Sequence, residues 1–300
     1  MLRYLFPREL KVSVKSYAFL VNINNEMWKR YKEEIEFDFS ATKIIYTNHL
    51  AMIIYIVQKI LDRKNLLTAI VGNERIDGKT LVDTLYRHYA AVKNPFIYPR
   101  IISYRNGSNS NSWLTELKSL NLEYYEKIKI IISELFANLK MHTTFQEGAF
   151  AGFIDNYNKY LFLSIINYDI EIKKTIELKQ HMIFKSDFEA LIWALKKTNT
   201  TRNEDESGGL GLYLLRKYIH ELHGECTIVT GNCFLRLDET CFNSINVNQI
   251  FFVEYKKLMQ NYGGNIISLK LPLEKSLNIA KNRISEEINI NLEGLNGLFS

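Results

Sequence analysis

The chain has 300 residues, 47% of them hydrophobic and 13% aromatic, a composition rich enough for packed cores and unlike that of a disordered chain. Its formal net charge of +5 comes from 38 basic and 33 acidic residues spread along the sequence, and no basic block stands out. The charge pattern therefore does not predict nucleic-acid binding. The length predicts about two domains.

The cysteine content and the hydropathy of the sequence indicate the cellular compartment of the protein. The three cysteines, Cys226, Cys233 and Cys241, are few and odd in number, which indicates reduced thiols. The longest near-continuous apolar run, at 50–57, is too short to span a bilayer, and the N-terminus lacks the layout of a signal peptide. We therefore expect a cytoplasmic protein that does not enter a membrane.

The first 105 residues predict a small α/β domain. Periodicity predicts strands at 11–23, 35–39, 66–71 and 97–104 and helices at 24–34, 49–63 and 79–92. Strands alternating with helices imply a sheet that is at least partly parallel. A polar segment within 106–121 is the expected linker to a second domain.

The second domain is expected at 122–273, followed by a tail at 274–300. It begins with a long helix at 122–142, and a helical segment is expected at 173–201. The predicted strands lie at 148–154, 159–166, 225–230, 234–237 and 266–271. Hairpins combined with helices predict an α+β two-layer sandwich.

A glycine-rich loop that opens a helix is the feature around which this domain is organised. The loop consists of Ser207, Gly208, Gly209, Leu210, Gly211 and Leu212. Three glycines in four positions let the backbone lie against a ligand, and the first N–H groups of a helix attract anions. The loop is therefore predicted to bind phosphate. The alternative is a glycine-rich turn before a core helix.

The long helix carries a second signal. Glu134 and Asn138 are four residues apart and therefore share a face. An Asn oxygen can supply one ligand to magnesium, which keeps waters and completes its shell with phosphates, while a Glu can orient or deprotonate water. The alternative is an ordinary solvated helix face.

Taken in chain order, these features resemble the GHKL superfamily of ATPases, which includes the ATP-binding domains of gyrases, heat-shock chaperones and histidine kinases. Glu134 and Asn138 match its N-box, and residues 207–212 match its second glycine box. The resemblance implies a Bergerat-type sandwich that binds ATP and magnesium under a lid at about 173–206. It implies Glu134 as catalytic base, Asn138 as magnesium ligand, and nucleotide contacts from Thr200, Thr201 and the loop.

One box departs from the family pattern. Asp-x-Gly-x-Gly, whose Asp accepts a hydrogen bond from adenine, is replaced by a segment that starts at Asn167 and carries Asp169 and Glu171 in place of the glycines. Asn167 retains an acceptor for adenine, whereas the two acids would add charge near the phosphates. Asn265, after two glycines, occupies the position where the family's last element usually has Thr.

The N-terminal domain looks like a STAS-type domain on the pattern of the 36–40 strand followed by the 50–61 helix. STAS-like and GHKL-like partners act together in bacterial anti-sigma switches, where the ATPase domain phosphorylates a Ser or Thr of its partner. This second resemblance rests on the order of elements and on no motif.

Two rival sites carry weaker signals. Residues 72–80 follow an apolar strand like a P-loop, but one residue too many separates the glycine from Gly78-Lys79-Thr80. His220, His223, Cys226 and Cys233 have spacings that a zinc site could use, with surface histidines and buried thiols as the alternative.

The sequence thus predicts a magnesium-dependent ATP-binding regulatory protein, either an ATPase or a protein kinase of the GHKL type, with a protein partner or a second copy. The alternative is a catalytically degenerate nucleotide sensor or scaffold, because both glycines of the altered box are lost.

Overall fold

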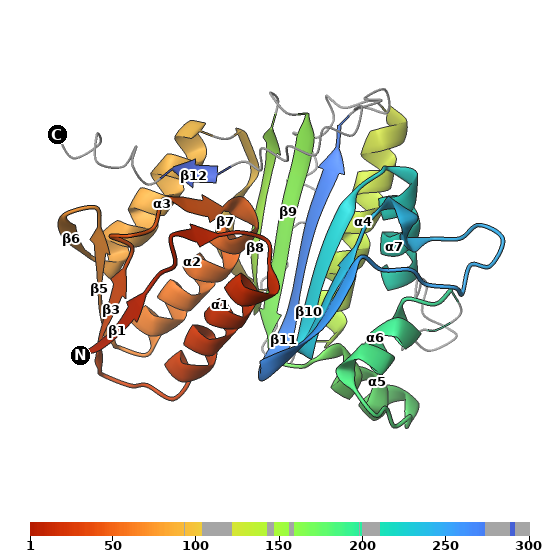
Figure 1. Cartoon of the computed structure of the whole chain (residues 1–300), viewed down its shortest axis with the longest axis horizontal. Helices are drawn as coiled ribbons and strands as arrows, with labels where there is room; N and C mark the ends of the chain where they lie inside the picture. The colour runs from red at the N-terminus through yellow and green to blue at the C-terminus, as the bar shows by residue number, and fades with distance from the viewer. Residues whose placement is uncertain are drawn as a thin grey trace.

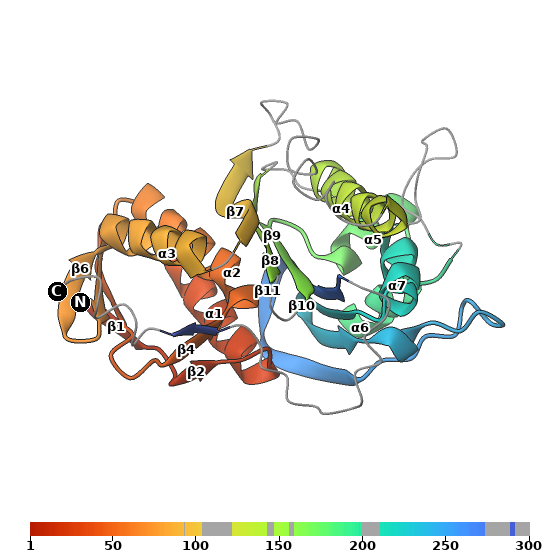
Figure 2. The same ribbon diagram turned by 90° about the horizontal axis from the view of Figure 1, so that it is seen from above.

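The computed structural model describes residues 1–92, 94–103, 122–142, 147–155, 159–197, 199, 211–273 and 289–291. The chain is a mixed α/β fold in which two helices, α1 (Val14–Met27) and α2 (Thr47–Asp62), lie between two sheets (Figures 1 and 2). Over these residues no helix is both long enough and apolar enough to cross a membrane.

The N-terminal sheet has the order β1-β3-β5-β6, with the first three strands parallel and β6 antiparallel. This confirms the prediction of a partly parallel sheet. Its strands are β1 (Leu2–Leu5), β3 (Glu34–Asp38), β5 (Leu66–Val71) and β6 (Glu74–Asp77). Helix α3 (Gly78–Val92) follows, and a small sheet contains β2 (Glu9–Leu10), β4 (Ile44–Tyr46) and β12 (Asn289–Asn291).

Helix α1 replaces the predicted strand at 11–23 and the predicted helix at 24–34. Ser13 caps it by accepting a hydrogen bond from the Ser16 N–H at 3.3 Å. Tyr17, Leu20 and Val21 follow at three- and four-residue spacing and are fully buried. The prediction was wrong because aromatic and β-branched residues favour strands locally, whereas burying one apolar helix face is worth more in the folded chain.

The second sheet has the order β10-β11-β9-β8-β7, and all its pairs are antiparallel. Its strands are β7 (Asn94–Ser103), β8 (Glu147–Asp155), β9 (Tyr160–Tyr168), β10 (Glu225–Leu237) and β11 (Glu254–Pro272). Strand β7 had been predicted as part of the N-terminal sheet, but it pairs with β8. The sheets therefore divide before residue 94 and not at the predicted boundary of 105.

Strand β10 folds back on itself at Gly231, which has a φ of +55°. Glu225 and Arg236 form an ion pair at 3.6 Å, although an extended strand would separate their backbones by roughly 36 Å. The Asp187 carboxylate accepts a hydrogen bond from the Asn232 N–H at 3.0 Å and fills the space that a Gly231 side chain would need. This agrees with the predicted hairpin.

Each face of the five-stranded sheet packs on its own helices. One face shares a core with α1 and α2, including Phe162, Phe234 and Ile266 of the sheet. The other face packs against α4 (Leu122–His142) and α7 (Gly211–Glu221). The predicted 122–142 helix is confirmed, and the segment expected to be helical from 173 contains α5 (Ile172–Gln180) and α6 (Asp187–Ala194).

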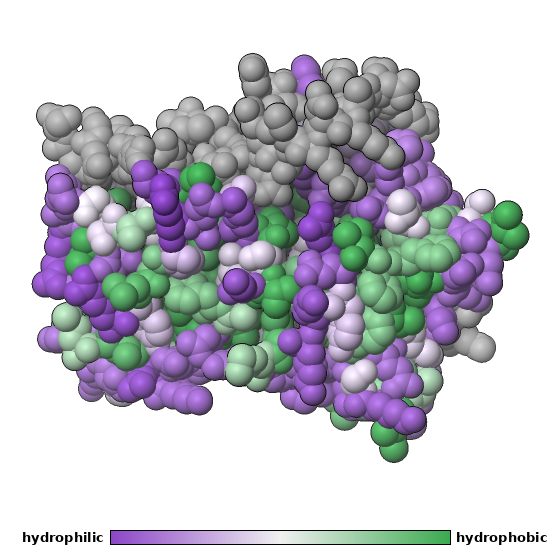
Figure 3. Space-filling view, viewed as in Figure 1, coloured by the Kyte–Doolittle hydropathy of each residue, from purple (hydrophilic) through white to green (hydrophobic). Residues whose placement is uncertain are grey.

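Exposed apolar side chains occur singly and in one short run, Phe251, Phe252 and Val253, before β11. Leu178 and Ile183 are exposed around α5, and Ile245 is exposed in the excursion between β10 and β11. Figure 3 shows green atoms at both places and interspersed purple and green atoms elsewhere on that face. Single exposed apolar side chains are normal on protein surfaces.

Candidate functional site

The Asn138 side chain lies directly against the backbone of Gly211. A Cβ built on Gly211 would overlap Asn138 Nδ2 and would lie 3.1 Å from Asn138 Cγ. The two residues are 73 positions apart (211 minus 138), and helices α4 and α7 bring them together. A side chain at 211 would displace the Asn138 side chain, so glycine permits this close approach of α4 and α7 at the last glycine of the predicted loop.

The rest of the predicted loop lies outside the described residues. This applies to Thr200, Thr201, Ser207, Gly208, Gly209 and Leu210. Gly211 is the first residue of α7, and Leu212 is half-buried and packs against the core beneath α4 and α7. The described structure therefore contains the helix end of the loop and its contact with Asn138.

Glu134 lies one turn before Asn138 on α4 and is half-buried. Its neighbours Leu135 and Phe136 are buried in the core, and the Phe136 ring stacks on Phe150 with centroids 4.3 Å apart. This packing fixes the rotation of α4 about its axis. Glu134 and Asn138 consequently share the helix face next to the start of α7.

A polar corner closes the same end of the sheet. Asn265 pairs with Asn167 in the β11–β9 register, and the Asn265 N–H donates to Asn167 Oδ1 at 2.7 Å. Asn265 Nδ2 donates to the Ile170 carbonyl at 2.9 Å, and Asn265 Oδ1 accepts from the Ile172 N–H at 3.2 Å. The Ile172 N–H also donates to Thr230 Oγ1 at 3.1 Å. The corner thus anchors the start of α5 to two strands, β10 and β11.

Strand alternation puts this corner on the α4 and α7 face. Ile165 and Ile267 pack in the core beneath these helices, and residues two positions away point to the same face. Helix α7 spans about 16 Å and leads through a short turn to the start of β10, whose residues 225–230 return over about 17 Å. Gly211 therefore lies at the same end of the sheet as Thr230.

Asn167 presents an unusual polar group. Its side chain is 1% exposed, its Oδ1 is held by Asn265, and its Nδ2 has no hydrogen-bond partner among the described residues. A buried, unpaired donor costs roughly 1–3 kcal/mol. The residue predicted to contact the nucleotide base is thus the one with an unused donor in this corner.

The altered turn after β9 carries less free charge than its sequence suggests. Glu171 is 2% exposed, and its Oε1 accepts from Asn261 Nδ2 at 2.7 Å and from Lys174 Nζ at 3.1 Å. Lys174, three residues later, neutralises the carboxylate, so Glu171 adds little repulsion toward a phosphate. Lys174 and Asn261 were not among the predicted site residues. The spacing from Glu171 to Lys174 could have signalled the pair.

The rival P-loop is a hairpin followed by a capped helix. Gly72 turns with a φ of +61° between β5 and β6, and α3 begins at Gly78. Asp77 Oδ1 accepts hydrogen bonds from the N–H groups of Lys79 and Thr80 at 2.8 and 2.9 Å. The amides that a phosphate would need are therefore already occupied by a side chain.

The rival zinc residues are held apart by other contacts. His220 Nδ1 contacts the Glu239 carbonyl oxygen at 2.6 Å, and His223 Nδ1 pairs with Glu239 Oε2 at 2.7 Å. Burial raises the pKa of the Cys233 thiol to about 12 and that of Cys226 as well, so both stay protonated at neutral pH. Over the described residues, no group of three or more His, Cys, Asp or Glu could hold a metal ion.

Arg216 of α7 is a buried cation that the sequence did not reveal. Its guanidinium is fully buried and donates to the carbonyl oxygens of Cys241, Val247 and Gln249, the last at 2.8 Å. Burial lowers its pKa. These bonds anchor the excursion between β10 and β11 to the helix that begins at Gly211.

No protein-family model matches the chain, and no curated protein matches it.

Proposed function

We propose that the site bounded by Asn138, Gly211 and Asn167, at one end of the five-stranded sheet, binds a nucleoside triphosphate with magnesium. The resemblance to GHKL-type ATPases favours ATP as the nucleotide. The observation that carries this proposal is the contact between Asn138 and Gly211. It joins the predicted metal ligand to the helix end of the predicted phosphate loop. The polar corner at Asn167 and Asn265 lies at the same end and on the same face of the sheet.

The donor set fits magnesium. The Asn138 amide oxygen would supply one protein ligand, and Mg²⁺ characteristically takes its remaining oxygens from waters and phosphates. When bound, the ion would neutralise charge on the triphosphate. Gly211 opens an 11-residue helix, and the first N–H groups of a helix favour an anion.

The remaining roles follow from position. Glu134, one turn from Asn138, would orient the attacking water or hydroxyl and accept its proton. The γ-phosphoryl group would then pass to water or to a hydroxyl of a protein partner. Asn167 would contact the base, and the segment beginning at α5 would form the lid. The STAS-like character of the N-terminal half remains a prediction.

Thermal unfolding with a non-hydrolysable ATP analogue and magnesium tests the proposal. Ligand binding to the native state raises the melting temperature, and a ligand at about one hundred times its Kd stabilises by about 2.7 kcal/mol. Asn138→Ala should abolish the magnesium-dependent part of the shift. No shift in the wild-type protein with any nucleotide would refute the proposal.

Turnover is tested separately. Glu134→Ala should abolish phosphate release while the analogue still binds, because Glu134 acts on the attacking group and not on the triphosphate. Glu126→Ala is the matched control, since Glu126 lies on the exposed face of the same helix. Equal loss of turnover in both variants would remove Glu134 from the proposed chemistry.

A second candidate, a nucleotide sensor without turnover, is favoured by the turn after β9. The family's two glycines there are acids, and Glu171 is committed to Lys174 and Asn261. Analogue binding in the wild-type protein without measurable phosphate release would favour this candidate.

A further inference from the structure

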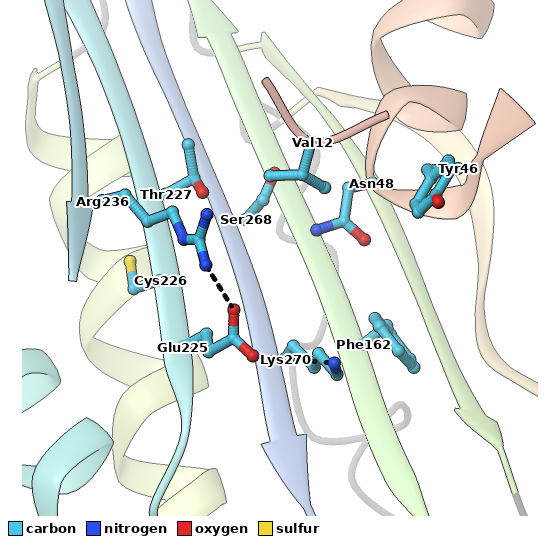
Figure 4. A pocket seen from close by; sticks show the side chains of 10 residues that line it. All are labelled: Val12, Tyr46, Asn48, Phe162, Glu225, Cys226, Thr227, Arg236, Ser268 and Lys270. Carbon is cyan, nitrogen blue, oxygen red and sulfur yellow. Dashed lines mark ion pairs between the residues drawn. The ribbon is translucent and has the colours of Figure 1, made fainter. Parts of the chain in front are cut away.

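A pocket opens on the other face of the five-stranded sheet, at the seam with the N-terminal half (Figure 4). Tyr46 and Asn48, at the start of α2, form one wall, and Phe162 of β9 forms another. Ser268 and Lys270 of β11 and Arg236 of β10 face them across the opening. The pocket is thus built from both halves of the chain.

The charged groups of this pocket carry an excess positive charge. Glu225 is the carboxylate among the lining residues, and it is shared by Arg236 and Lys270 at 3.6 Å each. Both separations exceed the 2.7–2.9 Å typical of a charge-assisted hydrogen bond. Two cations thus share one carboxylate loosely, and their N–H groups can turn to a better acceptor.

Lys270 is partly withdrawn from water, whereas Arg236 is more exposed, with 37% of its side chain accessible. The Lys270 side chain is 14% exposed, and its Nζ lies 4.7 Å from the centroid of the Tyr160 ring. An anion that entered here would meet a desolvated ammonium, for which the attraction is stronger than at an open surface. The first turn of α2, which has no acidic residue and no side-chain cap, adds to the positive potential.

The floor of the pocket continues into a buried polar chain. Tyr17 OH donates to Ser268 Oγ at 3.1 Å, Ser268 Oγ lies 3.2 Å from Ser164 Oγ, and Ser164 Oγ donates to the Asn48 carbonyl at 3.0 Å. This chain joins α1, α2 and the sheet. A ligand that contacts Ser268 or Asn48 would therefore bear on the seam between the two halves.

We propose that this pocket is a binding site for a small oxyanion, the phosphate or carboxylate group of a small molecule. Arg236 and Lys270 would bind the anionic group in place of Glu225, and the Asn48 side-chain amide would donate a hydrogen bond to it. The site lies on the sheet face opposite Asn138 and Gly211, so it is separate from the proposed nucleotide site. Occupancy stabilises the seam between the N-terminal helices and the sheet.

The experiment uses the full chain with inorganic phosphate and with succinate as probes, each titrated at constant ionic strength against chloride. Saturable binding is followed by thermal unfolding and by amide chemical shifts. Lys270→Gln should weaken phosphate binding about tenfold, because one charge-assisted contact is lost. Lys256→Gln, an exposed lysine of the same strand outside the pocket, should leave it unchanged.

A variant that should bind phosphate more tightly gives a second test, because misfolding could explain a loss of binding but not a gain. Glu225→Gln removes the competing carboxylate and should tighten phosphate binding severalfold. No saturable binding beyond chloride, or equal binding in wild type and Lys270→Gln, would overturn the proposal. Loss of phosphate binding in Asn138→Ala but not in Lys270→Gln would move the anion to the nucleotide site, which also overturns it. Absence of ATP binding alone would leave this pocket unaffected.

Discussion

The two faces of the five-stranded sheet are covered in different ways. The face toward α1 and α2 packs into one apolar core that includes residues from both halves of the chain, and the proposed anion pocket opens on this face. The face toward α4 and α7 is apolar in the middle and ends in a corner of amide and hydroxyl side chains around Asn167 and Thr230. The first face therefore holds the two halves together through its apolar core, whereas the second face has its polar groups at one end of the sheet.

This difference yields predictions about stability that can be ranked. A perturbation of the shared core should affect the whole chain, whereas one at the polar corner should be smaller and local. Contacts at the helix surface should matter least.

Phe234→Ala should have the largest effect. The side chain is fully buried in the shared core and contacts the Tyr17 ring of α1 at 5.8 Å between centroids. Truncating a buried Phe costs about 3–5 kcal/mol. Because the core spans both halves, chemical denaturation should show a single transition shifted to lower denaturant. Two separate transitions, with only one shifted, would contradict a shared core. Met259→Ala, which removes a fully exposed side chain, is the control.

Low pH should lower the stability of the folded chain through His49 of α2, which lies on the same side of the sheet. Burial lowers the pKa of this fully buried imidazole to about 4, and Nε2 lies 2.8 Å from the Lys11 carbonyl oxygen. The unfolded side chain titrates near 6.5, so between pH 6.5 and 4 the unfolded state binds more protons and stability falls as pH falls. The loss reaches roughly 3 kcal/mol at pH 4.

The His49 contribution is isolated by comparison with His49→Gln. Both proteins lose stability in acid through their carboxylates, but the variant should lack the histidine part between pH 6.5 and 4. Parallel stability curves for the two proteins over that range would show that His49 makes no such contribution.

Gly211→Ala probes the opposite face. The added Cβ overlaps Asn138 Nδ2, so one side chain must move, at a cost of about 1–3 kcal/mol. Truncating Asn138 as well should restore most of this stability, because the overlapping atoms are gone. A double variant no more stable than Gly211→Ala would mean that the two residues do not interact.

The smallest effect is expected at the ion pair that joins α4 to α7. Lys127 Nζ lies 2.9 Å from Glu221 Oε2, and both side chains are partly exposed. Lys127→Gln should cost up to about 1 kcal/mol at low salt and less at high salt. An effect that does not change with ionic strength would show that packing of the lysine stem is responsible.

Local patterns were sufficient where an element is long and strongly periodic. The helix at 122–142 and the strand at 66–71 agree with the structure residue for residue. In these segments propensity and tertiary packing favour the same conformation. Residues 72–77, expected as a polar loop between a strand and a helix, instead contain the Gly72 turn and strand β6, and Asp77 then caps α3.

Local patterns could not predict which strands, distant in the sequence, pair with each other. The strand at 94–103 has the right local pattern, but nothing in it specifies β8 as its partner. Helix α1 was missed because its apolar spacing becomes decisive only when a core receives it. At the candidate site, the meeting of Asn138 and Gly211 was expected from motif order, whereas the hydrogen bonds of Thr230 and Asn265 to the start of α5 depend on strand register.

The exchange of strands between the halves determines how this chain can be divided. Strand β7 follows the N-terminal helices in sequence but completes the five-stranded sheet, and β12, near the other terminus, pairs with β4 of the N-terminal half. A fragment ending at residue 105 would carry an unpaired strand and lose β12, and the complementary fragment would expose the edge of β8. Neither piece is a self-contained folding unit, and a cut before residue 94 would still divide the apolar core that α1 and α2 share with the five-stranded sheet.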